Sequence, residues 1–313
     1  MNSRAWTLLL VLAALWGSSY LFIKVALEDL SPAMIVFSRT ALAALILLPF
    51  ALATGALTGL RGRGGAVVAL AFVQIAAPFA LITFGERYIS SSLTGILVAS
   101  APIFTALFAP FLDDAERSAG MRLVGVAVGI VGVAVLLGLD SGDTPLALVG
   151  GLMVVLAGAC YALAGFYFKR RFVDVAPVGA VTVAMVATAA MLAVPAALSA
   201  PAAVPQATTL GAIAALGVGG TGIAFVIFYT LLGTVGPART SLVAYIAPGF
   251  AVVYGVTLLG ERFTLATLAG LALIIGGSWL AARGGVPFAR RRHVRLGTGA
   301  RVPTNDPERS VAP

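Results

Sequence analysis

Charged residues are scarce in this sequence. Of its 313 residues only 10% are charged, whereas 60% are hydrophobic and the mean hydropathy is +1.04. A water-soluble globule of this length needs more polar residues than that to cover its surface. The composition therefore excludes an ordinary soluble protein and indicates that lipid covers much of the chain.

Histidine and cysteine occur once each, as His293 and Cys160. Because His293 lies in the C-terminal tail, a Ser/His dyad and a histidine-based zinc site within the apolar part of the chain are excluded. A single cysteine cannot form an intrachain disulfide, so we expect Cys160 to be a small packing residue. We predict no metal site and no catalytic centre.

Two signatures of energy coupling are also missing. No G-x-x-x-x-G-K phosphate loop occurs, so the chain has no ATP site of that kind, and we expect no cofactor. Every Asp and Glu falls at the end of an apolar segment, in a loop or in the tail. Proton antiport through a carboxylate at the centre of a helix bundle is therefore not expected.

Long apolar runs make up most of the chain. A hydrocarbon core of about 30 Å is crossed by roughly 20 helical residues, and runs without strict alternation favour helices over a closed barrel. The first run resembles a secretory signal peptide, but its apolar character continues to Ile23, so we interpret it as an uncleaved span. Ten spans are predicted, at about residues 5–23, 33–53, 66–84, 93–112, 121–139, 147–168, 178–198, 210–232, 240–259 and 265–282.

The second half of the sequence repeats the first. Matched residues stand 145 or 146 positions apart: Trp16, Lys24, Asp29 and Pro32 with Tyr161, Lys169, Asp174 and Pro177; Thr94 and Ala101-Pro102 with Thr240 and Ala247-Pro248; Glu116-Arg117, Gly125 and Gly132 with Glu261-Arg262, Gly270 and Gly277. Similar apolar composition alone would not align charged residues and prolines.

An odd number of spans in each half inverts the second half relative to the first. The predicted fold is an all-α membrane protein with ten transmembrane helices in two five-helix repeats of inverted topology. The repeats span residues 5–139 and 147–282, and residues 284–313 follow as a basic tail.

Basic residues predict the orientation in the membrane. If the N-terminus is cytoplasmic, the opposite side carries only Lys24, Arg87 and Arg262, whereas the cytoplasmic side carries nearly all other Lys and Arg residues. Both termini are therefore expected in the cytoplasm. Most of the net charge of +8 lies in the tail, which we expect to be disordered and to contact anionic lipid headgroups, at about 1 kcal/mol per basic residue. No folded basic surface with interleaved aromatics indicates nucleic-acid binding.

An ordered set of short motifs carries a family resemblance. It comprises the run Trp16-Gly17-Ser18-Ser19-Tyr20 leading to Lys24, the Pro32 to Arg39 spacing, the Ala-Pro pairs at Pro102 and Pro248, and the turn Gly260-Glu261-Arg262. Together these resemble the EamA family of the drug/metabolite transporter superfamily, over about residues 4–285. The resemblance implies a ten-helix carrier in the bacterial cytoplasmic membrane, often an exporter of amino acids or other small metabolites. It implies no particular substrate.

Arg39 is the one charge deep inside a predicted span. It follows Pro32 by seven residues and so lies about 10 Å from the end of its helix. An arginine at a helix centre costs roughly 2.5–3.5 kcal/mol and usually faces an interior or an aqueous cavity. Two interpretations stay open: a structural one, in which Arg39 snorkels or pairs with Glu28, Asp29 or Glu86, and contact with an anionic substrate group. The matching residue is Ala184, so the role of Arg39 has no counterpart in the other half.

Polar and aromatic side chains within the apolar helices complete the candidate site. Trp16 and Tyr20 lie one helical turn apart, and Gln74 needs hydrogen-bond partners next to Pro78, which frees a backbone carbonyl. The predicted substrate-binding residues are Trp16, Tyr20, Arg39, Gln74, Tyr161, Thr221, Phe225, Tyr229, Ser241 and Tyr245, and the predicted hinges are Pro78, Pro102 and Pro248. Helix packing is the alternative role for each of these residues taken singly.

Three functional classes are compatible with these features. The favoured one is a secondary transporter that exports a small metabolite such as an amino acid by alternating access, binding it between the repeats. A multidrug exporter of lipophilic cations would favour the central carboxylate that is missing. A membrane scaffold or a lipid-modifying enzyme is the third, and no nucleophile, base or metal cluster supports an enzyme. The expected partners are a small-molecule substrate and membrane lipids, and no oligomeric state is predicted.

Overall fold

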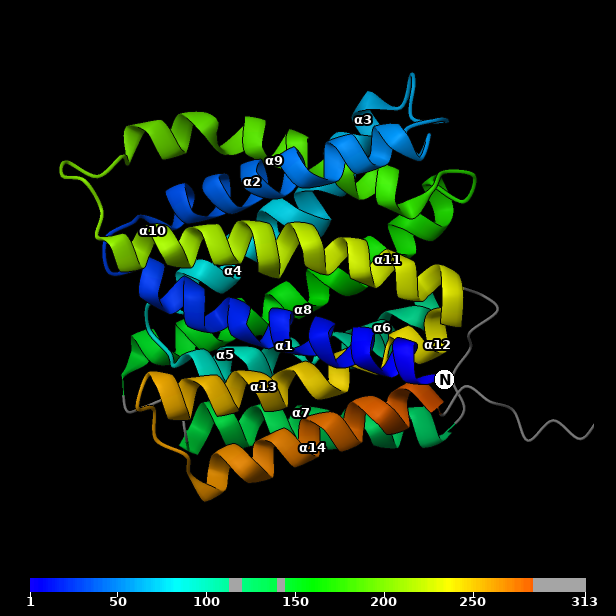
Figure 1. Ribbon diagram of the computed structural model, residues 1–313. Coiled ribbons are helices and arrows are strands. Elements are labelled where there is room, and N and C mark those ends of the chain that lie inside the picture. Colours follow the sequence, from blue (N-terminus) through cyan, green and yellow to red (C-terminus); the bar gives the residue numbers. More distant parts are fainter. Residues whose placement is uncertain (113–119, 140–143, 284–313) are drawn as a thin grey trace, which may run out of the picture.

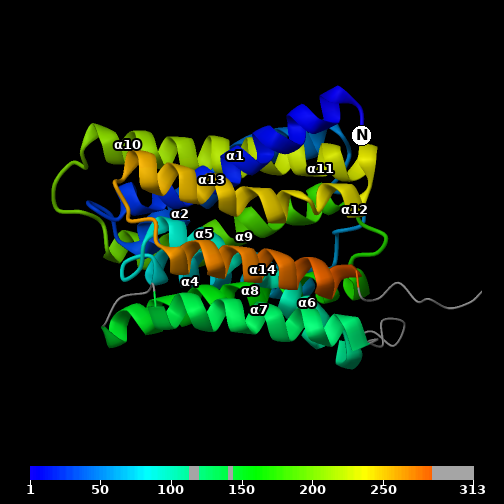
Figure 2. The ribbon, with the colours of Figure 1, turned by 90° about the horizontal axis from the view of Figure 1, so that it is seen from below.

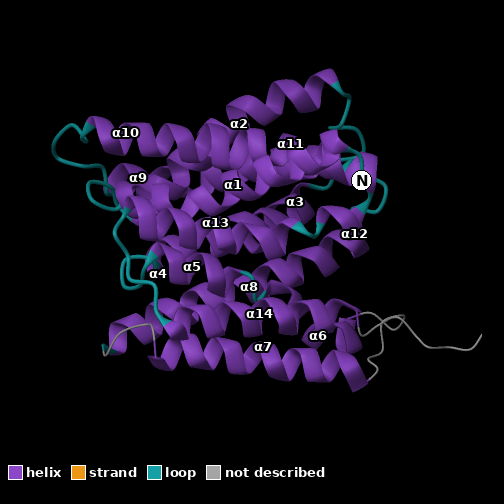
Figure 3. Cartoon of the chain, turned by 60° about the horizontal axis from the view of Figure 1, so that its bottom comes forward, coloured by secondary structure: helices purple, strands orange, loops and turns teal. Residues whose placement is uncertain are grey.

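The computed structural model describes residues 1–112, 120–139 and 144–283. Within these ranges the chain is helical and has no β-strand (Figure 3). Ten helical segments are long and apolar enough to cross a membrane, which confirms the predicted ten spans. The predicted tail 284–313 and the Glu116-Arg117 pair of the repeat lie outside the described residues.

Six spans are single helices and four are built from two or three consecutive helices. The single helices are α1 (Ser3–Ala26), α2 (Pro32–Ala53), α7 (Gly120–Leu139), α8 (Pro145–Arg171), α9 (Pro177–Leu198) and α14 (Leu265–Arg283). The composite spans are α3 (Gly64–Ala71), η1 (Phe72–Ala76) and α4 (Ala77–Gly85); α5 (Ser91–Val98) and α6 (Ala101–Leu112); α10 (Ala207–Ala214), η3 (Ala215–Ile223) and α11 (Ala224–Val235); and α12 (Pro237–Thr240) and α13 (Val243–Leu258).

Local sequence determines where several of these helices begin. Helices α2, α8, α9 and α12 start at a proline, whose fixed φ and missing N–H suit the first helical position. Ser31, Ser90 and Thr144 each accept a hydrogen bond at the start of the helix that follows. Such caps satisfy backbone N–H groups that a helix start leaves unpaired.

Contacts between the turns show that the two halves run in opposite directions. The ammonium group of Lys24, near the end of α1, donates hydrogen bonds to the carbonyls of Glu86 and Ile89 in the α4–α5 turn. Arg63, just before α3, pairs with Asp174 in the α8–α9 turn. The α3–α4 span separates these two turns, so α1 and α8 end at opposite ends of the bundle. We call these the Lys24 end and the Asp174 end; the N-terminus and the end of α14 both lie at the latter (Figure 1).

The helix packing follows the same symmetry. Helix α1 packs against α13 and α10–α11, and its repeat counterpart α8 packs against α5–α6 and α4. The pairs α2–α9 and α7–α14 lie at opposite edges of the bundle (Figure 1), and Figure 2 shows α7 beside α14 along one edge. Only small residues permit the α7–α14 approach, since a Cβ on Gly277 would lie 2.4 Å from the backbone nitrogen of Gly129.

Large apolar side chains cover the outside of the bundle. Leu45 is 71% exposed and Phe111 is 82% exposed, although both belong to spans. Water-soluble proteins seldom expose so many large apolar side chains together, and lipid contact explains them.

Candidate functional site

A cavity of about 530 Å³ lies between the two halves. Its wall is formed by the first four spans of each half, whereas α7 and α14, the fifth spans, do not line it. The volume lies within the range of about 300–1,000 Å³ that is usual for small-molecule sites. The lining residues are Trp16, Ser19, Tyr20, Ile23, Arg39, Gln74, Phe79, Ile82, Gly95, Val98, Ala99, Ala101, Pro102, Tyr161, Ala164, Gly165, Phe168, Pro177, Gly220, Phe225, Phe228, Tyr229, Leu232, Ala244, Ala247 and Pro248.

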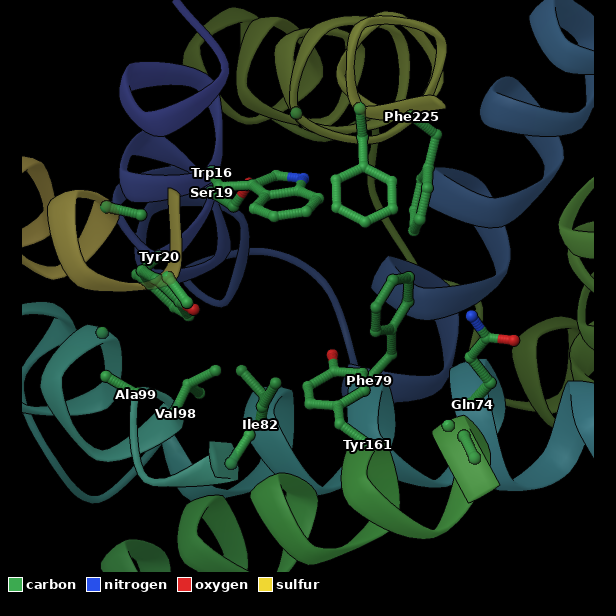
Figure 4. A pocket seen from close by; sticks show the side chains of 18 of the residues that line it. Trp16, Ser19, Tyr20, Gln74, Phe79, Ile82, Val98, Ala99, Tyr161 and Phe225 are labelled. Atoms are coloured by element: carbon green, nitrogen blue, oxygen red, sulfur yellow. The ribbon is translucent and has the colours of Figure 1, made fainter. Parts of the chain in front are cut away.

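Aromatic rings form much of the wall. Trp16 of α1 lies with its ring centroid 5.4 Å from that of Phe228 and 6.2 Å from that of Phe225, both on α11. Tyr229 stacks on Phe225 at 6.0 Å. Figure 4 shows Trp16 and Phe225 on one side of the cavity and Phe79 and Tyr161 on the other. Such walls suit the flat apolar body of an amphipathic solute.

Among the described residues, Arg39 is the one charged residue of the lining. It is only 5% exposed. Its Nε and Nη2 atoms donate to Thr221 Oγ1 at 3.2 and 3.1 Å, and its Cζ atom lies 3.8 Å from the centroid of the Phe79 ring. Thr221 Oγ1 donates in turn to the Leu216 carbonyl at 2.8 Å. The guanidinium is thus held in place by neutral groups.

No carboxylate neutralises Arg39 within the described part of the chain. Neither Glu28 nor Glu86 pairs with it, and Asp29 accepts instead from the Gln206 N–H at 2.8 Å and the Thr209 hydroxyl at 2.6 Å. The interpretation that Arg39 pairs with one of these three acids is therefore wrong. A cation held by neutral groups on a cavity wall can attract an anionic group of a ligand.

Seven of the ten predicted substrate-binding residues line this one cavity: Trp16, Tyr20, Arg39, Gln74, Tyr161, Phe225 and Tyr229. Thr221 is fully buried and contacts Arg39 directly. Ser241 and Tyr245 are not part of the lining, although Ala244 beside Tyr245 is. The Ser241 hydroxyl donates instead to the Ala238 carbonyl. Their role in binding, like that of the other eight, stays a prediction.

The predicted hinge prolines lie beside the cavity. Pro102 and Pro248 line it, and Pro78 is buried in α4 next to the lining residue Phe79. Two π-helical segments, η1 and η3, interrupt the third span of each half at corresponding positions, and Gln74 and Gly220 from these segments line the cavity. π-Helical segments are rare in proteins and, where they occur, are frequently found at functional sites.

Sequence reasoning missed several lining residues. Ser19 and Phe228 lie on the same helical faces as Trp16 and Phe225, three residues away, so their spacing could have identified them. Phe79 carried no such signal, because its contact with Arg39 joins two different spans.

The cavity reaches one end of the bundle. Phe168, near the last turn of α8, and Pro177, the first residue of α9, both line it at the Asp174 end. Toward the Lys24 end the lining stops at Ile23 and Ile82, which are 1% and 3% exposed. Lys24 follows directly and ties α1 to the α4–α5 turn at 2.8 and 2.9 Å. The structure is thus closed at the Lys24 end.

Comparison with known proteins identifies both halves. The EamA-like transporter family matches residues 4–138 and again residues 148–283. YedA, an uncharacterized inner membrane transporter of Escherichia coli strain K12, is 29% identical over 269 residues, which cover 85% of each chain. A probable amino-acid metabolite efflux pump of the same strain is 26% identical over 310 residues, covering 95% of this chain and 100% of that protein. A chain of known crystal structure shares the fold with a TM-score of 0.65 and 23% identity, covering 90% of this chain and 97% of that one.

Proposed function

Since this chain belongs to the EamA-like transporter family, we propose that it is a secondary transporter that exports a small amphipathic metabolite bearing a carboxylate, such as an amino acid. Its two halves, residues 5–139 and 147–282, alternate access to the cavity between them. The similarity to a probable amino-acid metabolite efflux pump supports both the substrate class and the direction.

One observation carries the choice of substrate class. In the part of the chain that the structure describes, the cavity lining contains the cation Arg39 and no Asp or Glu. A ligand carboxylate can accept from the guanidinium in a charge-assisted hydrogen bond, while the rings of Trp16, Phe225 and Phe228 contact its apolar part. Gln74, Tyr20, Tyr161 and Tyr229 supply neutral hydrogen-bonding groups. The predicted prolines and the two π-helical segments are the bending points of the composite spans.

The same observation disfavours the multidrug alternative. A lipophilic cation would meet the charge of Arg39 in a low-dielectric cavity without a carboxylate to bind it. A non-transporting scaffold would not need a cavity of this size with a cation on its wall.

The distribution of basic residues supports the orientation. Arg4, Arg63, the run Lys169-Arg170-Arg171 and Arg239 lie at or near the Asp174 end, whereas Lys24, Arg87 and Arg262 lie at the Lys24 end. The Asp174 end and both termini therefore face the cytoplasm in our proposal, and the cavity faces inward, as it must to collect a solute for export.

A paired resistance assay tests this function. Cells that overproduce the chain and cells that lack it are exposed side by side to toxic amino-acid analogues and to cationic dyes. We expect resistance to the analogues alone, and we expect Arg39→Ala at equal protein level to abolish it. The matched control is Arg262→Ala, which removes an exposed arginine at the Lys24 end and should retain resistance. Dye resistance instead, or full resistance with Arg39→Ala, would overturn the proposal.

A further inference from the structure

Glu86 is a buried acid that the proposed transport site does not use. It is 0% exposed and follows directly on the last residue of α4. Both of its carboxylate oxygens are without a hydrogen-bond partner among the described residues, and so is the hydroxyl of Ser91, which is 1% exposed at the start of α5. Leaving an ionised carboxylate unpaired in such a place costs several kcal/mol, and such a group usually neutralises instead.

Lys24, the cation with the largest electrostatic effect on this carboxylate, does not neutralise it by direct contact. The Lys24 ammonium donates to the backbone carbonyl of Glu86 at 2.8 Å and to that of Ile89 at 2.9 Å. It thereby binds to the C-terminal end of α4, where a helix offers unpaired carbonyls. The Glu86 side chain forms no ion pair with it.

The other ionisable groups around Glu86 act in both directions. Glu261, from the segment between α13 and α14, repels its negative charge, whereas Lys24 of α1 and Arg39 of α2 attract it. Tyr20 of α1 is close enough to interact electrostatically with it, and Arg87 and Tyr88 follow it in its own turn. Helix α8, packed against α4, presents Gly150 and Val154 there. Burial dominates this balance and raises the pKa of the Glu86 carboxyl well above its usual 4.5.

We propose that Glu86 is the proton-binding group of this transporter: its carboxyl takes up a proton when the Lys24 end closes and releases it when that end opens to water. This inference rests on the alternating access proposed above. Glu86 lies one turn beyond Ile82 and its turn is bonded to Lys24, the neighbour of Ile23, so it stands just past the point at which the cavity is closed.

Linkage gives the sign of the effect. The closed state binds the proton more tightly than the open, hydrated state does, so acid favours closure and alkaline pH favours opening of the Lys24 end. Protons outside the cell would thereby promote return of the empty carrier to the inward-facing state. This placement differs from a carboxylate at the centre of the bundle, because Glu86 binds its proton at the closure and not beside the substrate.

Thiol labelling measures this opening without any substrate. The full chain with Cys160→Ser and Ile23→Cys is treated in spheroplasts with a membrane-impermeant maleimide at external pH values from 5 to 8. Ala202→Cys, exposed in the turn between α9 and α10, corrects for the pH dependence of the thiol itself. We expect the corrected labelling to rise with pH, by at most about tenfold per pH unit, as one proton requires.

Variants of Glu86 decide whether this group is the cause. Glu86→Gln, which resembles the protonated acid, should give low labelling that no longer changes with pH, while Glu86→Asp should retain a pH-dependent rise. Glu28→Gln removes an exposed carboxylate at the same end and should behave like the parent. An unchanged rise in Glu86→Gln, or no rise in the parent, would overturn the inference. If the parent chain exports no amino-acid analogue but its labelling still rises with pH, the proposed substrate is wrong and the role of Glu86 stands.

Discussion

The guanidinium of Arg39 lies over the ring of Phe79, with 3.8 Å between its central carbon and the ring centroid. The two residues come from α2 and α4, so the contact forms only when the second and third spans pack together. It places a cation on the wall of a largely apolar cavity and gives that cation a fixed direction. The proposed carboxylate selectivity depends on this geometry.

Replacing Phe79 should therefore weaken substrate binding without removing the charge. A cation over an aromatic ring contributes about 0.5–2 kcal/mol, depending on solvation, so Phe79→Leu should raise KM for a carboxylate substrate roughly 2- to 30-fold. Phe79→Tyr should change it little. The measurement is initial-rate transport in proteoliposomes, with Phe84→Leu, an exposed site on the same helix, as the control. Equal KM values for Phe79→Leu and Phe84→Leu would show that the ring does not orient Arg39.

Two adjacent glycines of α14 should respond in opposite ways to alanine. A Cβ at Gly277 would lie 2.7 Å from the Gly125 carbonyl oxygen, whereas nothing lies within 4 Å of a Cβ at Gly276. Gly277→Ala should destabilise the protein by about 1–3 kcal/mol through overpacking, and Gly276→Ala should be neutral or slightly stabilising because alanine favours helix. Thermal unfolding in detergent compares them, and a similar midpoint for both variants would contradict the close α7–α14 packing.

Glu261 should stabilise the Lys24 end by capping a helix of the other half. Its carboxylate accepts from the N–H groups of Ser91 and Ser92 at 2.7 and 2.9 Å and also from the Ser92 hydroxyl. Hydrogen bonds to a charged group contribute about 1.5–3 kcal/mol, so Glu261→Ala should lower the unfolding midpoint clearly. Arg262→Ala, at the exposed neighbouring position, should leave it unchanged. If both variants unfold alike, the cap contributes nothing measurable.

Asp29 and Asp174 should make the stability of the folded protein decrease at low pH. Hydrogen bonds from Thr209 and Gln206 lower the pKa of Asp29, and those from Arg63 lower the pKa of Asp174, both below the usual 3.8. A lowered pKa in the folded state means that the stabilisation is complete above the usual pKa and is lost as pH falls through the lowered one. We expect the thermal unfolding midpoint to decrease as the pH is lowered below about 4.

The pH dependence of the unfolding midpoint of a double variant tests whether Asp29 and Asp174 cause this loss of stability. In Asp29→Asn with Asp174→Asn, the acid-side loss should be smaller than in the parent, since neither amide titrates. Asp174 is exposed and Asp29 is only partly buried, so solvent screens both carboxylates and the effect is expected to be modest. An identical acid limb in parent and variant would assign the loss to other carboxylates.

These two aspartates also show where sequence comparison stopped. Their match across the repeat was visible at an offset of 145 residues. Their partners were not, because Asp29 bonds to the start of α10 and Asp174 to Arg63 before α3, more than a hundred residues away in each case. The repeat identified equivalent positions, and the fold assigned equivalent tasks to them: each joins the turn after the first span of one half to the third span of the other half.

The candidate site was predicted only in part, because contacts between residues far apart in the sequence are not visible from the sequence. Trp16, Tyr20 and Arg39 stood out because each is a polar or aromatic residue within an apolar helix, and all three line the cavity. Ser241 and Tyr245 had the same local appearance but lie outside the lining. Helical spacing shows which residues share a face, and it does not show whether that face meets lipid, another helix or a cavity.

The sequence by itself determined the ten spans, their division into two halves and the reversal between those halves. Each depends on properties that are local in the chain: apolar length against the thickness of the bilayer, proline and cap residues at helix starts, and an odd count of spans. Only the tertiary structure decided that Arg39 meets Phe79 and Thr221 instead of a carboxylate. It also decided that the buried Glu86 carboxylate has no hydrogen-bond partner among the described residues. Those relationships depend on which spans pack together, because burial and charge neutralisation are set by neighbours that lie far apart in the sequence.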